Sequence, residues 1–223
     1  MKRGIFITGT DTGVGKTYIA AGIAGELRSR GVDVGVMKPA ETGCRKRSGR
    51  LVPVDAARLM QSAGVRDSLA LVNPYRFRKP LAPSVAAAME GRSIRIEGIV
   101  KAYQTLAGRH DCMIVEGAGG VMVPLRDDYL FLDLMKLMGL PAVIVARPGL
   151  GTINHTLLTI EALSKKRVHV SGIVINYAVR GKPGDAEKTS PAVIEKHSGV
   201  PVIAIMPHGA SNFRNLINHI PCE

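Results

Sequence analysis

Short runs of apolar, mostly β-branched residues recur along the chain, and longer segments with helical periodicity lie between them. The runs predicted as strands are residues 4–8, 32–37, 112–115, 142–146, 168–175 and 202–206. The segments predicted as helices are residues 16–30, 54–63, 84–90, 97–106, 131–138, 154–165, 191–197 and 212–219. Continuous apolar strands that alternate with helices are typical of a parallel sheet covered on both faces. The pattern therefore predicts a doubly wound α/β fold with a mainly parallel sheet.

Polar and glycine-rich clusters follow the carboxyl ends of the predicted strands. They lie at residues 9–17, 38–43, 116–120, 149–154, 176 and 207–209. In an open parallel sheet these strand ends share one edge, and ligands bind in the crevice outside it. We therefore expect an active site at the carboxyl edge of the sheet.

The first of these clusters, Gly-Thr-Asp-Thr-Gly-Val-Gly-Lys-Thr at residues 9–17, joins a strand to a helix. Its glycines let backbone N–H groups surround phosphate oxygens at the helix N-terminus. Lys16 is placed to reach the terminal phosphates, and the Thr17 hydroxyl is placed to ligate Mg²⁺. The strict phosphate-loop pattern needs a glycine at position 10, where Thr10 stands, so this loop begins at Gly9. An ordinary glycine-rich turn is the alternative, and nucleotide binding is the prediction.

Composition narrows the class of protein. The chain has 223 residues, of which 46% are hydrophobic and 22% charged, which excludes a disordered or collagen-like chain. A formal net charge of +12 favours anionic partners. The basic runs at residues 45–47 and 165–167 contain no interleaved aromatic residues, so we expect no stacking platform for single-stranded nucleic acid. We expect the first run to be a mobile, solvated loop.

The three cysteines, Cys44, Cys112 and Cys222, have no CxxC spacing. The simplest interpretation is a reduced, cytoplasmic protein. The apolar run near the start of the chain is too short to form the core of a signal peptide. No apolar run approaches the ~20 residues that are needed to span a bilayer. We therefore expect no membrane association.

Four segments resemble motifs of the dethiobiotin synthetase family. Residues 9–17 are similar to its GTDTxVGKT signature, and Met37-Lys38-Pro39 is similar to the segment around its second-strand lysine. VEGAGG at residues 115–120 and GLGTINH at residues 149–155 resemble two further family motifs in the family order. The resemblance implies one P-loop α/β domain over residues 1–223. It also implies a cyclo-ligase that converts 7,8-diaminopelargonate, CO₂ and ATP, through a carbamate and a carbamic-phosphoric anhydride, to dethiobiotin, ADP and phosphate.

The resemblance implies catalytic and metal-binding roles for five residues. Lys38 and Lys16 are the implied catalytic cations, and Thr17, Asp55 and Glu116 are the implied ligands of Mg²⁺. This set suits in-line phosphoryl transfer, which depends on positioning and charge stabilisation. The alternatives are structural: Lys38 as a solvated strand-end lysine, Asp55 as a first-turn acid, and Glu116 in a salt bridge to Lys16 or Lys38.

The resemblance also implies a set of contacts with ATP. They are Thr12, Gly13, Val14, Gly15, Lys16, Thr17, Tyr18, Asp55, Glu116, Gly117, Ala118, Gly119, Asn176, Tyr177, Pro207, His208 and Gly209. Asn176 is alternatively a turn residue. Gly13 departs from the family pattern, in which an acidic residue often stands, so any role of that acid is absent or replaced here. Tyr177 is also atypical.

Substrate contacts are implied for Thr42 and for the segment Gly151, Thr152, Ile153 and Asn154. In the family the second segment comes from the partner subunit, which implies a homodimer. Backbone N–H groups at a helix start suit the carboxylate tail of the substrate. Helix capping by Thr152 or Asn154, and a turn at Thr42, are the structural alternatives.

Two other classes of protein remain open. A partitioning-type ATPase that binds DNA or membrane suits the basic charge, but its signature lysine is replaced by Asp11, and residues 212–219 are not a basic amphipathic helix. An amidoligase of the cobyrinic acid diamide synthase type needs a glutamine-hydrolysing domain, which we do not expect in this chain.

Overall fold

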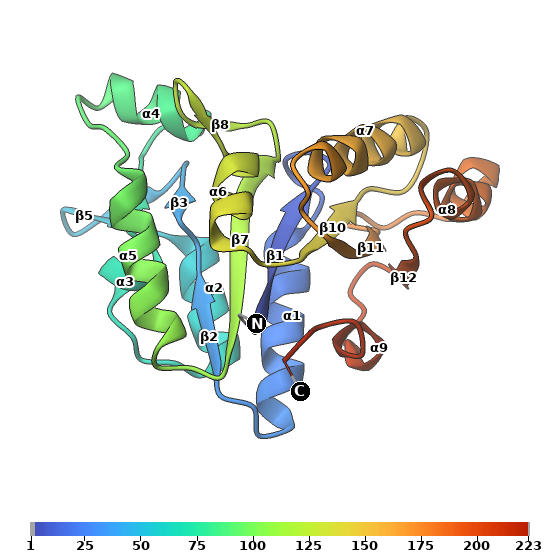
Figure 1. Cartoon of the computed structure of the whole chain (residues 1–223), viewed down its shortest axis with the longest axis horizontal. Helices are drawn as coiled ribbons and strands as arrows, with labels where there is room; N and C mark the ends of the chain where they lie inside the picture. Colours follow the sequence, from blue (N-terminus) through green and yellow to red (C-terminus); the bar gives the residue numbers. More distant parts are fainter. Residues whose placement is uncertain (1–2, 223) are drawn as a thin grey trace.

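The computed structural model describes residues 3–222, and it contains one six-stranded parallel sheet with the strand order β12-β11-β10-β1-β7-β2. The strands are β1 (Gly4–Gly9), β2 (Val34–Met37), β7 (Cys112–Gly120), β10 (Ala142–Ala146), β11 (Val170–Asn176) and β12 (Val202–Met206). Figure 1 shows the strands running in one direction through the molecule. The predicted doubly wound parallel sheet is confirmed.

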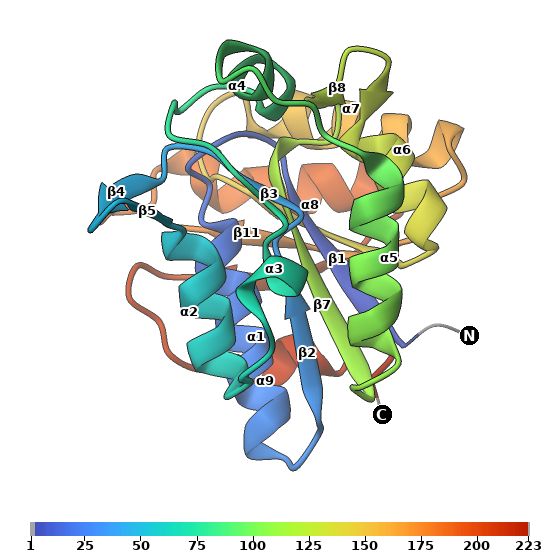
Figure 2. The same ribbon diagram turned by 90° about the vertical axis from the view of Figure 1, so that its left-hand side faces the viewer.

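Helices cover both faces of the sheet (Figures 1 and 2). One face is covered by α1 (Lys16–Ser29), α2 (Val54–Ala63) and α9 (Arg214–Ile217), and the other by α5 (Ile96–Ala107), α6 (Phe131–Met138), α7 (Thr152–Lys165) and α8 (Asp185–Ser198). The central strands β1 and β10 are buried along their whole length, which fits their position between two layers of helices.

One predicted helix boundary is wrong by six residues. Pro191 suggested a helix start, but α8 begins at Asp185 and continues through it. The start lies where the Glu187 carboxylate accepts a hydrogen bond from the Gly184 N–H at 2.9 Å. A favourable first turn therefore outweighs the one backbone hydrogen bond that proline cannot donate.

Small elements that the periodicity does not predict surround the carboxyl edge. They are α3 (Leu69–Val72), α4 (Pro83–Met89) and the strand pairs β3 (Ala40–Glu41) with β6 (Tyr75–Arg76), β4 (Arg45–Arg47) with β5 (Arg50–Val52), and β8 (Pro124–Arg126) with β9 (Tyr129–Leu130). The predicted loop at residues 45–47 is corrected: these residues form an antiparallel hairpin. The turn is made by Ser48 and Gly49, both at positive φ, which matches the twist of a tight hairpin.

The cysteine prediction is also corrected. Cys112, at the start of β7, forms a disulfide with Cys222 near the end of the chain, and their Cα atoms are 5.3 Å apart. The pair is 110 residues apart in sequence, so spacing alone could not reveal it. Cys44 is free and buried, and burial raises the pKa of its thiol to about 11.

None of the helices within residues 3–222 is long and apolar enough to cross a membrane.

His110 links three segments at the amino edge of the sheet. Its Nδ1 lies 2.8 Å from a carboxylate oxygen of Asp33, and its Nε2 lies 2.8 Å from one of Asp67. Arg109 also pairs with Asp67, at 3.0 Å. Burial lowers the pKa of His110, but the hydrogen bonds and charges of the two carboxylates outweigh burial and raise the pKa above 6.5.

We expect this histidine to make the stability of the fold depend on pH. Because the folded-state pKa is raised, the contribution is complete below pH 6.5 and is lost as the pH rises through the folded-state value. His110→Gln removes charged hydrogen bonds and should lower the free energy of unfolding at about pH 6 by about 1–3 kcal/mol. Urea unfolding of the wild type and the variant from about pH 5.5 to about pH 9 measures this difference, which should shrink toward alkaline pH.

His197→Gln is the matched control, because His197 is an exposed histidine without a described partner. A difference between wild type and His110→Gln that stays constant with pH would contradict this role.

Candidate active site

A cavity of about 550 Å³ opens at the carboxyl edge of the sheet. It brings together residues predicted from separate parts of the sequence. Those that line it are Thr12, Gly13, Gly15, Lys16, Thr17, Lys38, Thr42, Asp55, Glu116, Ala118 and Gly119. The convergence of strand ends, which the sequence predicts, therefore has a physical counterpart in one cavity.

The phosphate loop between β1 and α1 requires glycine at Gly15. Its φ of 94° is left-handed, and a Cβ atom there would lie 2.1 Å from the amide nitrogen of Asn176. The Lys16 ammonium donates to the Asp11 carbonyl at 2.8 Å. Burial, and next the positive charge of Lys38, lower the pKa of Lys16 to about 8, despite the opposing carboxylates. The phosphate loop thus holds the buried Lys16 ammonium against its own backbone.

Lys38 lies at the end of β2 and is almost completely buried. The backbone is held on both sides, because Lys38 N–H donates to the Val72 carbonyl at 2.8 Å and Asn73 Nδ2 donates to the Lys38 carbonyl at 2.6 Å. The ammonium lies 2.5 Å from Glu116 Oε1 and 3.0 Å from Asp55 Oδ2. Burial opposes its charge, but the two carboxylates raise the pKa of Lys38. The structural alternative of a solvated strand-end lysine is therefore wrong.

Glu116 occupies the centre of the cluster and has no exposed surface. Its Oε1 accepts hydrogen bonds from Thr17 Oγ1 at 2.8 Å and from the Lys38 ammonium. Its Oε2 is buried and has no hydrogen-bond partner. The proposed salt bridge to Lys38 is present, yet half of this carboxylate remains unsatisfied, which is costly in an apolar setting.

The predicted Mg²⁺ ligands Thr17, Asp55 and Glu116 fit the ion, because Glu116 Oε2 has no hydrogen-bond partner among the described residues and is free to bind it. Thr17 bonds to Glu116, and Lys38 connects Glu116 to Asp55, so all three oxygen donors belong to one cluster. Among residues 3–222 no group of three His, Cys, Asp or Glu side chains is arranged to hold a metal. Mg²⁺ needs no such group, because it binds one or two carboxylates and completes its octahedron with phosphate and water.

Glu41, which was not predicted from the sequence, is a buried acid in the wall of this cavity. Its two carboxylate oxygens accept hydrogen bonds from the backbone N–H groups of Asp55 and Ala56, each at 3.0 Å. Helix α2 has no side-chain cap of its own at Pro53, so Glu41 supplies the cap from β3. Burial raises the pKa of Glu41, although the two backbone bonds oppose this. The sequence around it, Pro-Ala-Glu-Thr-Gly at residues 39–43, places an acid among apolar and small residues. This pattern could have indicated a buried acid.

The segment 80–83, which ends at the first residue of α4, also lines the cavity and was not predicted from the sequence. The pairing of β3 with β6 brings this segment close to the loop that carries Thr42. Gly43 N–H donates to the Lys79 carbonyl at 3.2 Å, and Gly43 has a φ of 77°. Thr42 therefore faces a wall made by a distant part of the chain.

Several predicted nucleotide contacts do not line the cavity. Val14 is in the core, and Asn176 donates to its carbonyl at 2.8 Å. The Tyr18 hydroxyl donates to the Ala210 carbonyl, and His208 Nδ1 lies 3.1 Å from the Ala178 carbonyl. These bonds hold the segments after β11 and β12, with Tyr177, Pro207 and Gly209, next to the phosphate loop. Gly117, also outside the lining, accepts a hydrogen bond from Lys38 at 3.1 Å.

The segment 151–154 begins α7, away from this cavity. Gly151 is the N-cap, with a φ of 86°, and no side chain caps the helix, so the capping alternative is wrong. The hydroxyl groups of Thr152 and Thr156 are buried without a hydrogen-bond partner. Leu150, directly before this segment, is 88% exposed.

Solved structures with a similar fold include the cell division ATPase MinD of Pyrococcus furiosus, with a TM-score of 0.53 and 18% identity over 100% of this chain and 90% of that one. The septum site-determining protein MinD of Pyrococcus horikoshii, complexed with Mg-ADP, gives a TM-score of 0.55 at 18% identity, over 100% of this chain and 88% of that one. At this identity the likeness concerns the fold alone.

Sequence relatives are much closer. A model of a AAA domain family matches residues 3–211. The chain is 46% identical over 215 residues to the ATP-dependent dethiobiotin synthetase BioD of Thermodesulfovibrio yellowstonii, covering 93% of this chain and 90% of that protein. It is 46% identical to the protein of the same name from Bacillus licheniformis, covering 92% and 86%. For that of Methanocaldococcus jannaschii the identity is 47%, covering 77% and 78%. The chain therefore belongs to the ATP-dependent dethiobiotin synthetase family.

Proposed function

We propose that this protein is an ATP- and Mg²⁺-dependent cyclo-ligase that makes dethiobiotin from 7,8-diaminopelargonate, CO₂ and ATP. The observation that carries the proposal is the cluster of buried Lys38 and Glu116 with half-buried Asp55 beside the phosphate loop. Family membership gives the substrates, and the cluster gives the charges that the chemistry needs. We further propose that residues 1–223 act as one P-loop domain in the cytoplasm.

The reaction can be written with every bond accounted for. One amine of the diamine and CO₂ form a carbamate, with release of a proton. A carbamate oxygen attacks the γ-phosphorus of ATP, and ADP leaves. The second amine then attacks the carbonyl carbon of the mixed anhydride, loses one proton to solvent, closes the ureido ring and expels phosphate, which keeps the former carbamate oxygen. Each step moves negative charge between oxygens, so fixed cations are the main requirement.

The two lysines serve this requirement at different places. Lys16, at the mouth of the phosphate loop, would leave the Asp11 carbonyl and bind the β- and γ-phosphates. Lys38 would contact the γ-phosphate and the carbamate oxygen that attacks it. Its fixed backbone and raised pKa keep it charged at that position. No strong protein base is needed.

Thr17, Asp55 and Glu116 would hold Mg²⁺, with Glu116 Oε2 as a free donor. When bound, the ion supplies positive charge that neutralises the phosphate oxygens and aligns them for in-line transfer. The backbone N–H groups of residues 12–18 would hold the phosphates. Gly117–Gly119 would border them, and Asn176, Tyr177 and Pro207–Gly209 would contact the base and sugar of ATP.

We propose that the active unit is a homodimer. Thr42 would bind the diamine, and the segment Gly151–Asn154 of the partner subunit would bind its carboxylate. Exposed apolar side chains near this segment support an interface: Met122 is 60% exposed, Leu150 88% and Leu158 56%. Met122 and Leu158 line the same small cavity beside α7.

A DNA- or membrane-binding ATPase is not favoured. The position of its signature lysine is held by Asp11, whose carboxylate accepts a hydrogen bond from Thr12 N–H at 2.6 Å. The relatives at 39–47% identity carry the synthetase name, whereas the cell division ATPases resemble this chain in fold alone.

The direct test is ADP release from MgATP and bicarbonate, measured with and without 7,8-diaminopelargonate. We expect release that depends on the diamine, with dethiobiotin formed in equal amount. Lys16→Ala should lower this rate by about 10²–10³-fold, because a cation on the phosphates is lost. ADP release that ignores the diamine would contradict the proposal and favour the partitioning ATPase. Normal turnover by Lys16→Ala would remove this lysine from the mechanism.

Glu116→Gln tests the metal assignment. The variant keeps the shape of the side chain but loses its charge, so the Mg²⁺ concentration for half-maximal rate should rise by roughly 10- to 100-fold. The readout is a Mg²⁺ titration of initial rate at saturating ATP. Glu161→Gln is the control, since Glu161 pairs with Lys165 on an exposed helix surface. An unchanged titration in Glu116→Gln would show that this carboxylate does not bind the metal.

Glu41→Gln tests whether Glu41 positions Asp55. An amide replaces one carboxylate oxygen with a donor that faces a backbone N–H, so one charged hydrogen bond, about 1.5–3 kcal/mol, is lost. Because Asp55 begins α2, the Mg²⁺ requirement should rise about tenfold.

Ser68→Ala is the matched control, because the Ser68 hydroxyl accepts from Ala70 N–H at the start of α3. This variant should lose about 1 kcal/mol of stability with no change in Mg²⁺ requirement. If Glu41→Gln behaves in the same way, Glu41 is only a structural cap.

A further inference from the structure

A second cavity, of about 660 Å³, lies at the amino edge of the sheet, opposite the candidate active site. It is bordered by the end of α6, by the segments that lead into β10 and β11, and by residues 218–221 near the end of the chain. The proposed ligase reaction uses no residue there. The volume is within the range of cavities that bind small molecules.

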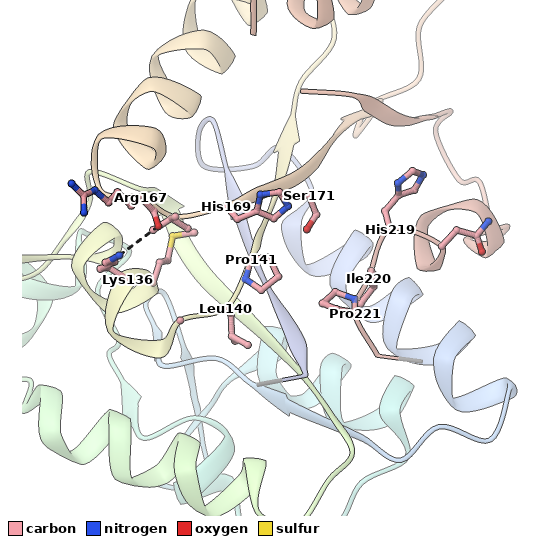
Figure 3. A pocket seen from close by; sticks show the side chains of 13 residues that line it. Lys136, Leu140, Pro141, Arg167, His169, Ser171, His219, Ile220 and Pro221 are labelled. Atoms are coloured by element: carbon pink, nitrogen blue, oxygen red, sulfur yellow. Dashed lines mark hydrogen bonds between the residues drawn. The ribbon is translucent and has the colours of Figure 1, made fainter. Parts of the chain in front are cut away.

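One wall of this cavity is apolar. Met135, Leu140 and Ile220 are buried side chains, and Pro141 and Pro221 lie beside them. Figure 3 shows Leu140 and Pro141 between α6 and the chain end that carries Ile220 and Pro221. The disulfide between Cys112 and Cys222 anchors this chain end to β7. The part of the wall that Ile220 and Pro221 form is therefore held near β7 by a covalent bond.

The cavity is also lined by polar and basic residues. His169 and Ser171 flank Val170 at the start of β11, and the two-residue period of a strand places both on the same side. Lys136 and Arg167 lie together at one end (Figure 3), where the Lys136 ammonium donates to the Arg167 carbonyl at 3.5 Å. No Asp or Glu side chain is among the described residues that line the cavity.

Of the basic run at residues 165–167, the two lysines form ion pairs, whereas the arginine at the cavity forms none with the described residues. Lys165 pairs with Glu161 at 2.8 Å, and Lys166 pairs with Asp133 at 2.7 Å. Arg167, at the mouth of the cavity, has no carboxylate partner within residues 3–222, and neither has Lys136. The two cations next to the cavity are thus the ones that remain available to an anion.

The backbone at Arg167 adds an independent observation. Arg167 has a φ of 56° directly after α7, a position where helices usually place glycine. Val168 N–H donates to the Leu163 carbonyl at 2.9 Å, which closes the helix end. A side chain at this φ lowers the stability of the fold relative to glycine. The backbone conformation therefore does not explain why an arginine stands at this position.

We infer that this cavity is a binding site for a small aliphatic carboxylate, separate from the active site. The carboxylate would be held by Lys136 and Arg167 at one end of the cavity, and His169 lies farther along the cavity. The hydrocarbon chain would pack along Leu140, Pro141, Ile220 and Pro221. Both parts are needed: the cations select the charge, and the apolar wall selects a chain over a bare inorganic anion.

Octanoate is the probe, and its binding to the whole protein is measured by calorimetry and by saturation-transfer NMR in the presence of saturating MgADP and dethiobiotin, which block the active site. We expect saturable binding of octanoate. Octanamide, which has the chain without the charge, and inorganic phosphate, which has the charge without the chain, should each bind at least about tenfold more weakly.

Arg167→Gly and Lys136→Gln identify the site. Glycine suits the positive φ, so Arg167→Gly should fold with unchanged or higher stability, yet it should weaken octanoate binding about tenfold. Lys136→Gln should weaken it similarly. Lys165→Gln is the matched control, because this lysine is already paired and does not line the cavity.

Three results would overturn the inference: no saturable binding of octanoate, equal binding of octanamide or phosphate, or binding that neither Arg167→Gly nor Lys136→Gln weakens. Diamine-dependent ADP release should be unchanged in both variants when no octanoate is present. This assay is independent of the binding assay, so the ligase proposal and the carboxylate site can fail separately.

Discussion

The buried ammonium group of Lys38 is the interaction on which the candidate active site depends. It contacts Glu116 from β7 and Asp55 from α2, and it donates to the Gly117 carbonyl. Without it two carboxylates would lie close together in a poorly solvated cavity, and breaking a buried pair costs about 3–5 kcal/mol. Burial, and next the charge of Lys38, lower the pKa of Lys16, so this part of the site gains from binding phosphate. The Lys38 ammonium therefore both stabilises the two carboxylates and adds positive charge that favours binding of phosphate.

The neighbours of this ammonium extend its effect to the rest of the site. Glu41 caps α2 and fixes Asp55, while Asn73 holds the backbone of Lys38. Thr17 connects the phosphate loop to the same carboxylate that Lys38 contacts. A change of ligand at the phosphate loop therefore reaches α2 through three contacts, Thr17–Glu116, Glu116–Lys38 and Lys38–Asp55. This coupling suits a reaction in which phosphoryl transfer and ring closure occur at adjacent positions.

Much of this arrangement could be predicted from the sequence, and the failures have physical causes. The boundaries of β10, β12, α2 and α6 follow from local apolar patterns and are confirmed. The edge that carries the site follows from parallel topology. Glu41, segment 80–83 and the disulfide could not be found in this way, because each depends on a contact between distant parts of the chain. The lysine–glutamate pair appeared only as an alternative, since pairing depends on burial as well as on residue type.

The distribution of basic residues separates the two edges of the sheet. At the carboxyl edge Lys16 and Lys38 are buried near carboxylates, which balance their charge until phosphate enters. At the amino edge Lys136 and Arg167 are exposed and form no ion pair with a carboxylate of the described chain, and an apolar wall lies beside them. A net charge of +12 is more than one ATP site needs, and part of the excess lies at this second cavity. A fold built for phosphate at one edge can thus hold a carboxylate at the other, because the sheet keeps the two sites apart.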